Sequence, residues 1–195
     1  MADDPGRRYH HGDLRAAVLA AAVEVIGESG TSGLSLRDLA RRAGVSHAAP
    51  AYHFGDKEGL LTALASQGYE LLADALEAAR GAGGEILEVG LAYVRFAVDH
   101  PAHFKVMFQP DLYPDDDPTL AAARQRAAEA LRAEVTALPG VDPQIARLAA
   151  WSIVHGFATL WLGGALRQAA GQDDATDLAR PVIRLLFGHD SDRAT

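Results

Sequence analysis

Residues 34–61 restrict the possible folds more than any other stretch of the chain. Their sequence, LSLRDLARRAGVSHAAPAYHFGDKEGLL, reads as a short helix, a turn at Gly44, a second short helix and the beginning of a third. Two short helices that are joined by a tight, glycine-containing turn form a helix-turn-helix unit. The segment therefore predicts a small head of packed helices near the N-terminus.

Capping residues set the expected ends of these helices. The expected pairs of cap and helix are Ser35 with 36–43, Ser46 with about 47–53, and Asp56 with 57 to about 80. Gly44 is expected to end the first of them. With Ser46 as the cap, Pro50 is the fourth residue of the second helix, where proline removes a backbone hydrogen bond. We therefore expect this helix to be bent or very short.

The rest of the chain also has helical patterns. Apolar residues recur every three or four positions, and no stretch alternates between apolar and polar residues as a strand does. Further helices are expected from the cap Asp13 to near Ser29, over 85–100, 101–108, 118–138 and 177–187, and from the cap Asp142 to about 170, with a loop over 110–118. We predict an all-α protein of about nine helices.

Composition excludes several classes of protein. The chain has no cysteine, which removes disulfides, thiol chemistry and most structural zinc sites. Since it has no glycine-rich phosphate loop, no His-Glu-x-x-His pattern and no nucleophile elbow, we expect no catalytic residue, metal site or cofactor. It has no uninterrupted run of about 18 apolar residues and no apolar core in its first dozen residues. We therefore expect a cytoplasmic protein without a membrane span or secretory signal.

A helix-turn-helix unit usually places its second helix in the major groove of DNA, so the net charge of −8 needs an explanation. The charge is unevenly distributed. Residues 1–62 carry seven Lys and Arg against eight Asp and Glu, net −1, so the other 133 residues carry eleven against eighteen, net −7. The acidity belongs to the C-terminal part, and the N-terminal part is compatible with DNA binding.

The motifs of the head resemble those of one family of DNA-binding proteins. Ser-Leu-Arg-Asp-Leu-Ala at 35–40, Ala-Gly-Val-Ser at 43–46, His-Phe at 53–54 and Asp-Lys-Glu-x-Leu-Leu at 56–61 follow one another as in regulators of the tetracycline-repressor (TetR) family. The resemblance implies a flexible arm over 1–12, a DNA-binding domain over 13–60 and a helical effector-binding and dimerisation domain over 61–195. It also implies a repressor that binds a palindromic operator as a homodimer.

Residues at the start of the second helix are expected to read bases in double-stranded DNA. In such a unit the first residues of that helix reach base edges, which selects His47, Ala48 and Ala49. The expected cap Ser46 is a further candidate for contact with DNA. A histidine can donate or accept at a base edge, whereas an alanine methyl can only contact a thymine methyl or leave room. Arg37 is a candidate for bidentate contact with guanine, and a phosphate contact is the open alternative.

Other residues of the head are expected to contact phosphate. The resemblance implies this role for Ser35, Tyr52, His53 and Lys57. Two positions depart from the family's pattern, because Pro50 replaces an aliphatic residue and Ala51 replaces the usual tyrosine. We expect Tyr52 to substitute for that tyrosine.

The resemblance further implies a small hydrophobic or amphipathic effector in the C-terminal domain. The candidates for its pocket, on helices expected to be buried, are Tyr93, Phe96, Phe104, Met107, Trp151 and His155. The same side chains can simply form core, and that reading is favoured for each one. Trp151-x-x-x-His155-Gly156 resembles the signature of a WHG-type C-terminal domain. Because a buried histidine needs a partner from the protein or from a ligand, both roles of His155 stay open, and a structural role is favoured.

The last two helices are expected to form the seam of a homodimer. The residues that suggest it are small or apolar: Gly156, Ala158, Leu160, Gly163, Gly164, Leu166, Val182, Leu185, Leu186 and Phe187. A C-terminal domain that serves a protein partner, or no ligand at all, is the alternative. An all-α enzyme is a remote one.

Overall fold

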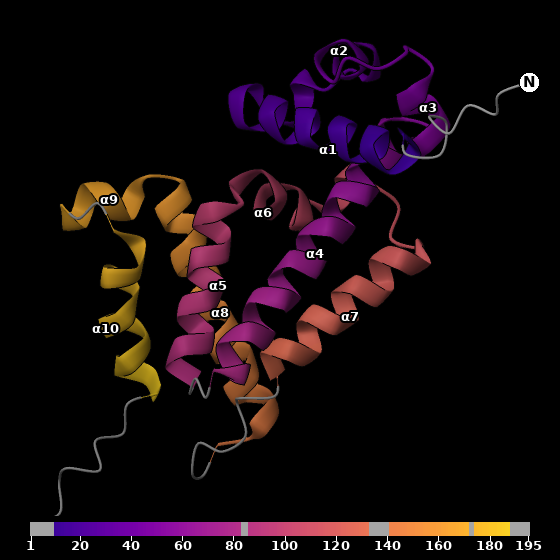
Figure 1. Ribbon diagram of the computed structural model, residues 1–195. Helices are drawn as coiled ribbons and strands as arrows, with labels where there is room; N and C mark the ends of the chain where they lie inside the picture. Colours follow the sequence, from indigo (N-terminus) through magenta and orange to yellow (C-terminus); the bar gives the residue numbers. More distant parts are fainter. Residues whose placement is uncertain (1–9, 83–85, 133–140, 172–173, 188–195) are drawn as a thin grey trace, which may run out of the picture. The chain divides into compact units, whose positions relative to one another are not determined.

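The structure is a computed structural model and describes residues 10–82, 86–132, 141–171 and 174–187 (Figure 1). Within these ranges it contains α-helices, two 3-10 turns (Thr31–Gly33 and Pro110–Leu112) and no strand, which confirms the all-α prediction. The α-helices are α1 (His10–Ser29), α2 (Leu36–Arg42), α3 (Ala49–Phe54), α4 (Lys57–Gly81), α5 (Ile86–Asp99), α6 (Pro101–Met107), α7 (Pro118–Arg132), α8 (Pro143–Leu162), α9 (Ala165–Ala170) and α10 (Ala175–Phe187).

The chain forms two compact units. Unit 1 contains the described residues up to Gln67 together with Ala102–Leu120, and unit 2 contains Gly68–Pro101 together with the described residues from Ala121 onward. This division differs from the expected domain boundary at residue 60. The reason is that α4 contributes to both units and that the segment from α6 to the start of α7 belongs with the N-terminal helices.

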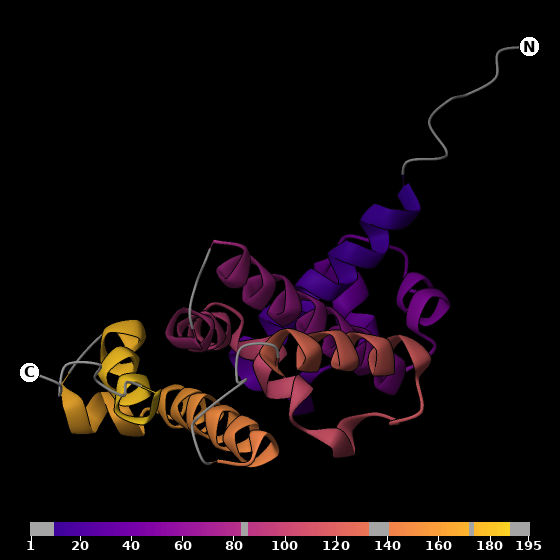
Figure 2. The ribbon, with the colours of Figure 1, turned by 90° about the horizontal axis from the view of Figure 1, so that it is seen from below.

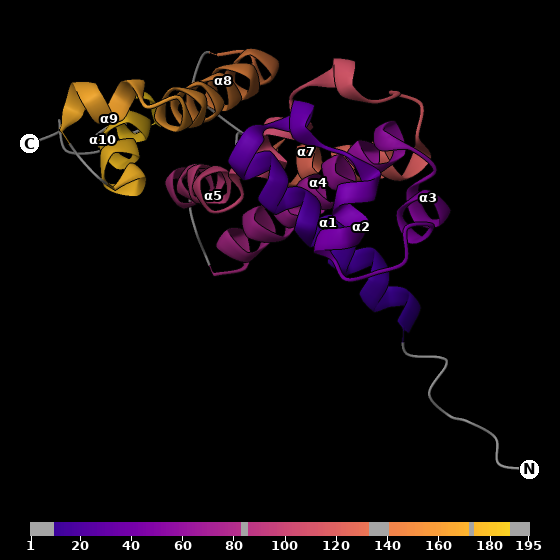
Figure 3. The same ribbon diagram turned by 90° about the horizontal axis from the view of Figure 1, so that it is seen from above.

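In unit 1, α1, α2 and α3 pack against one another (Figure 3). Leu39 and Ala40 of α2 are completely buried, as the stripe of apolar residues in this helix predicts. At the surface, Arg42 of α2 donates two hydrogen bonds to the carboxylate of Glu28 in α1, at 3.1 and 2.8 Å. These bonds and the charge of Arg42 lower the pKa of Glu28. The pair links α2 to α1 at the surface, where such a pair contributes little to stability.

The expected loop over 110–118 is anchored to the helix before it. The hydroxyl of Tyr113 is buried and donates to the backbone carbonyls of Val106 and Met107, at 3.1 and 3.0 Å. Asp117 then accepts a hydrogen bond from the backbone N–H of Leu120 and caps α7. The loop therefore holds a defined position in unit 1.

In unit 2, α5 packs against both α8 and α10 (Figures 1 and 2). Gly90 lies where α5 meets these helices. A Cβ atom at this position would lie 3.2 Å from Cδ1 of Ile183 in α10 and 3.4 Å from Cγ1 of Val154 in α8. The missing side chain allows the three helices to approach closely, and both facing residues are buried.

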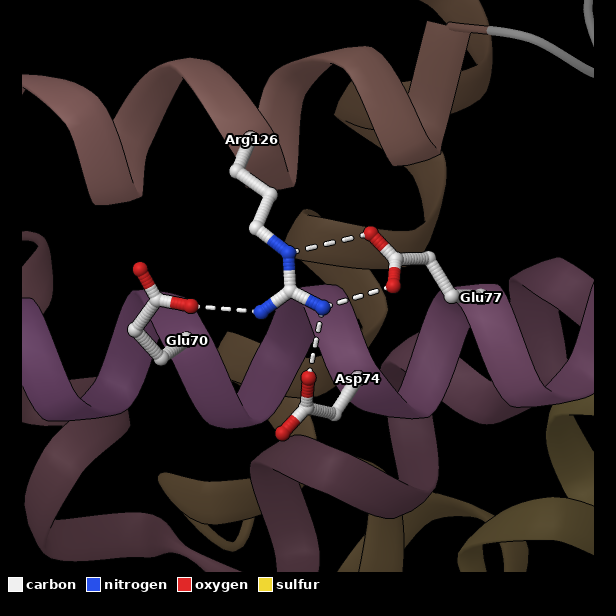
Figure 4. A network of polar contacts seen from close by, with 4 residues as sticks. All are labelled: Glu70, Asp74, Glu77 and Arg126. Atoms are coloured by element: carbon white, nitrogen blue, oxygen red, sulfur yellow. Dashed lines mark hydrogen bonds and ion pairs between the residues drawn. The ribbon is translucent and has the colours of Figure 1, made fainter.

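A cluster of charges joins α4 to α7 within unit 2 (Figure 4). The guanidinium of Arg126 donates hydrogen bonds to Glu70, Asp74 and Glu77, which lie on one face of α4 at spacings of four and three residues. These bonds raise the pKa of Arg126, with Glu77 making the largest contribution. The groups are solvent-exposed, so dissolved salt screens the attraction.

Outside residues 34–61, the first helix and the helix expected after Asp142 differ most from their predicted bounds. The first begins at His10 instead of at the expected cap Asp13, so residues 10–12 of the expected arm are helical and the rest of the arm lies outside the described residues. The expected helix from Asp142 to residue 170 is divided into α8 and α9. Gly163 and Gly164 separate them because Gly164 has a φ of 83°, a left-handed conformation that suits glycine.

Two predicted N-caps are confirmed. The carboxylate of Asp56 accepts a hydrogen bond from the backbone N–H of Gly59 at 2.9 Å. Asp142 accepts from the N–H groups of Gln144 and Ile145, and Pro143 follows it in the first turn of α8. The caps fix where α4 and α8 begin.

Helix α8 meets the length and composition requirement for crossing a membrane, with a mean hydropathy of 1.3 over its most apolar window. A third of that window is buried. One such helix is weak evidence for a membrane span, because apolar helices of soluble proteins meet the same requirement.

Candidate nucleic-acid interface

The turn between α2 and α3 has the geometry of a helix-turn-helix unit. Gly44 follows α2 with a φ of 65°, and the N–H of Val45 returns to the carbonyl of Ala40 at 3.0 Å. Ser35 occupies the N-cap position of α2, as predicted, but its side chain makes no capping hydrogen bond. Its hydroxyl group is on an exposed residue and is available to a partner.

Helix α3 begins later than predicted. Ala48, not Ser46, occupies the N-cap position, while His47 and Ala48 form a turn closed by a 3.0 Å bond from the N–H of Ala49 to the carbonyl of Ser46. Pro50 consequently lies in the first turn of the helix, where backbone N–H groups have no acceptor within the helix. The missing N–H of proline therefore removes no helical hydrogen bond. Of the two expected alternatives, a bent or a very short helix, the structure has the short one, since α3 has six residues.

The exposed side of the turn and α3 carries most of the predicted DNA contacts. Tyr52 is 80% exposed. The other exposed residues of this side are Ser46, His47, Ala48 and Ala51, whereas Ala49 and His53 are half-buried. Pro50 and Phe54 are buried and attach the helix to the unit. The side chains that face solvent are thus small, except for one imidazole and one phenol.

Charge is available at two of the predicted positions. Arg41 forms an ion pair with Asp38 at 3.5 Å, and Arg42 is held by Glu28. Arg37 and Lys57 are exposed, and neither has an ion pair or side-chain hydrogen bond to any residue that the structure describes. These two cations are therefore free to meet phosphate or base edges.

A further cation, which the sequence did not single out, lies against α3. The Cζ atom of Arg15 in α1 lies 5.4 Å from the centroid of the Phe54 ring, within the range of a cation–π contact. Arg15 is outside the motif of residues 34–61, and its spacing in α1 gives no sign of this contact. Only the packing of α1 on α3 reveals it.

In unit 2 the structure brings together three of the predicted effector residues. The hydroxyl of Tyr93 in α5 is hydrogen-bonded to Nδ1 of His155 at 3.0 Å and accepts a bond from Nε1 of Trp151 at 3.4 Å. Burial raises the pKa of Tyr93 and lowers that of His155, so both side chains are neutral at neutral pH. The protein itself thus supplies a partner for His155, and Trp151 is 39% exposed instead of buried as predicted.

The other predicted effector residues do not join this polar cluster. Phe96 is buried in unit 2 and packs near His100, with 5.4 Å between the ring centroids. Phe104 and Met107 are buried in unit 1, on α6. The predicted set is therefore divided between two units, and a role in the core accounts for each of these three side chains.

One face of α8 exposes apolar and small residues. Ile145, Leu148 and Leu160 are 57%, 49% and 51% exposed. The helical spacing puts these three residues on one side of α8 together with Ser152 and Gly156. A Cβ atom added at Gly156 would meet nothing within 4 Å. On α10, Leu185 is 85% exposed. Side chains of this kind on two neighbouring helices are typical of a surface that another protein covers.

Comparison with known proteins assigns both parts of the chain. Residues 86–186, about half of the chain, match the family described as "Tetracyclin repressor-like, C-terminal domain". Residues 18–64 match "Bacterial regulatory proteins, tetR family". The WHG subtype stays a prediction, because the description of the matched C-terminal family is more general.

Individual relatives agree with these matches. The HTH-type transcriptional regulator BetI of Rhizobium meliloti is 47% identical over 49 residues, and this match spans only about a quarter of each chain (25% and 24%). A Rhodococcus sp. RHA1 protein of unknown function is 34% identical, with a TM-score of 0.75 over 93% of this chain and 97% of that one.

A solved structure with a stated function has the same architecture. The TetR family transcriptional regulator PfmR of Thermus thermophilus is 26% identical, with a TM-score of 0.67 over 87% of this chain and 96% of that one. Its whole length is thus comparable with this chain. Together with the helix-turn-helix geometry of α2 and α3, the comparisons lead to one conclusion: the chain belongs to the TetR family of DNA-binding transcriptional regulators.

Proposed function

We propose that the protein is a cytoplasmic, ligand-responsive repressor that binds a palindromic operator as a homodimer. The observation that carries the proposal is the helix-turn-helix unit, which has exposed residues on α3 and two unpaired cations, Arg37 of α2 and Lys57 of α4. Affinity for the duplex comes from the cations, and discrimination between sequences comes from the side chains that reach base edges.

The exposed face of α8 supports dimerisation. A twofold axis places the same apolar patch on both subunits, so each patch covers the other. Two recognition helices related by such an axis bind half-sites about 34–36 Å apart or multiples of that distance. A palindromic operator follows from this symmetry.

The effector is proposed to be small and hydrophobic or amphipathic. Tyr93, Trp151 and His155 form a polar group in unit 2 that reaches from the buried Tyr93 to the partly exposed Trp151, and it supports binding of a ligand that carries a hydrogen-bonding group. A C-terminal domain that serves a protein partner, or no ligand, is the second candidate. Thermal unfolding in the presence of a panel of hydrophobic metabolites distinguishes the two candidates. A ligand that binds only the native state raises the midpoint of unfolding.

Selection of bound duplexes from a random library tests the proposed function directly. The expected result is a palindromic consensus whose half-sites are one helical turn or a multiple of it apart. Absence of any preferred duplex at low salt would overturn the proposal.

Arg37→Ala is expected to relax sequence preference at particular base pairs. A bidentate contact with a base contributes about 1–3 kcal/mol to discrimination against the wrong base. Replacing each base pair of the selected operator in turn, and comparing affinities for the variant and the parent protein, measures this loss. If Arg37→Ala weakens all duplexes equally, Arg37 contacts phosphate instead.

Lys57→Gln is expected to weaken binding to every duplex without changing base preference. A phosphate contact carries no sequence information, and each one changes the slope of log affinity against log salt by about 0.9. The measurement is a salt titration of operator binding. The slope of log affinity against log salt is expected to become less steep by about one per subunit. An unchanged slope would exclude a phosphate contact for Lys57.

A further inference from the structure

Arg15 is a third cation at the surface of unit 1 that is available to DNA. It is exposed, and no acidic residue in the described part of the chain forms an ion pair with it. Its guanidinium lies over the ring of Phe54, the last residue of α3. The contact fixes a positive charge beside the helix that is proposed to enter the groove, and at the C-terminal end of that helix, where its dipole favours a cation.

The contact with the Phe54 ring leaves the hydrogen-bonding groups of Arg15 available. The guanidinium presents five N–H donors in a planar fork, and no ion pair or side-chain hydrogen bond to a described residue occupies them. Phe54 is only 8% exposed, so the ring is held firmly by the unit. A planar donor group held in this way suits the two oxygens of a phosphate, which accept a bidentate pair of hydrogen bonds.

We propose that Arg15 contacts a phosphate of the operator backbone and that its contact with Phe54 holds it in place for this purpose. The inference rests on the proposed function, because it requires α3 to lie in the major groove. It adds α1 to the DNA-binding surface and assigns Arg15 a role in affinity, not in base readout. Per dimer, two further phosphates are neutralised.

The test is a salt titration of binding to the selected operator with three variants at this position. A plot of log affinity against log salt has a negative slope. Arg15→Gln is expected to make this slope less steep by about 1.8 per dimer, since each of two phosphate contacts contributes about 0.9. Base preference stays unchanged. Arg15→Lys keeps a positive charge and is expected to restore most of the slope, whereas Arg15→Met is expected to resemble Arg15→Gln.

Arg124→Gln is the matched control. Arg124 also lies over an aromatic ring, that of Tyr69, at 5.7 Å, but in unit 2. Its replacement is expected to leave the slope unchanged. Circular dichroism and thermal unfolding check that each variant folds.

Two results would overturn the inference. One is an unchanged slope in a folded Arg15→Gln variant. The other is loss of affinity in Arg15→Lys equal to that in Arg15→Met, which would mean that Arg15 acts only by positioning Phe54. Both leave the proposed function intact as long as the parent protein still selects a duplex. If the parent protein selects none, the proposed function fails with the inference.

Discussion

A chain that carries Leu148→Glu and Leu160→Glu is expected to sediment as a monomer and to lose binding to a palindromic operator. Both leucines lie on the exposed face of α8. Burial of a leucine side chain contributes about 1.5–3 kcal/mol to the free energy of association. Because the proposed dimer has twofold symmetry, each replacement occurs twice in the interface. The variant also brings four carboxylates to the seam. Loss of the dimer removes the linkage between the two recognition helices.

Analytical ultracentrifugation at micromolar concentration measures the change in oligomeric state, and operator binding is measured on the same samples. Ala121→Glu with Ala122→Glu on the exposed side of α7 is the control, because it adds the same charge away from α8. It is expected to stay dimeric and to bind DNA. A Leu148→Glu, Leu160→Glu variant that remains dimeric would remove α8 from the interface.

The sequence was sufficient for the fold class and for the helix-turn-helix unit. Periodic apolar residues and two aspartate caps, Asp56 and Asp142, act through local geometry, so their effect can be predicted without knowledge of the tertiary structure. The start of α3 was less predictable. A serine can cap a helix only if its side chain reaches a backbone N–H group of the first turn. In the structure the carbonyl of Ser46 instead closes a turn with the N–H of Ala49, and α3 begins after that turn.

The predicted sites depended on tertiary contacts to different degrees. The exposure of Tyr52 follows from its place opposite Pro50 and Phe54, the buried side of α3, whereas His47 and Ala48 are exposed in the turn before the helix. The contact of Arg15 with Phe54 and the bond between Tyr93 and His155 join residues that are 39 and 62 positions apart. No local pattern encodes such pairs. The chemistry of a buried histidine predicts that His155 has a hydrogen-bonding partner. The sequence alone does not identify that partner as Tyr93.

Gly90→Leu is expected to lower the free energy of unfolding by about 2–3 kcal/mol, the upper part of the range for overpacked sites. Even the first added carbon would lie 3.2 Å from Ile183 and 3.4 Å from Val154. A leucine adds three more carbons at a point where α5 meets α8 and α10, so these helices must separate. The better helix propensity of leucine offsets only up to about 1 kcal/mol of this cost.

Chemical unfolding at a fixed protein concentration measures the effect, since the stability of the proposed dimer depends on concentration. Gly27→Leu in α1 is the matched control, because this glycine is exposed and an added Cβ would meet nothing within 4 Å. It is expected to leave the protein as stable as the parent, or more so, through its helix propensity. Gly90→Ala should fall between the two. If Gly90→Leu is as stable as Gly27→Leu, the close approach of α5 to α8 and α10 does not depend on the missing side chain.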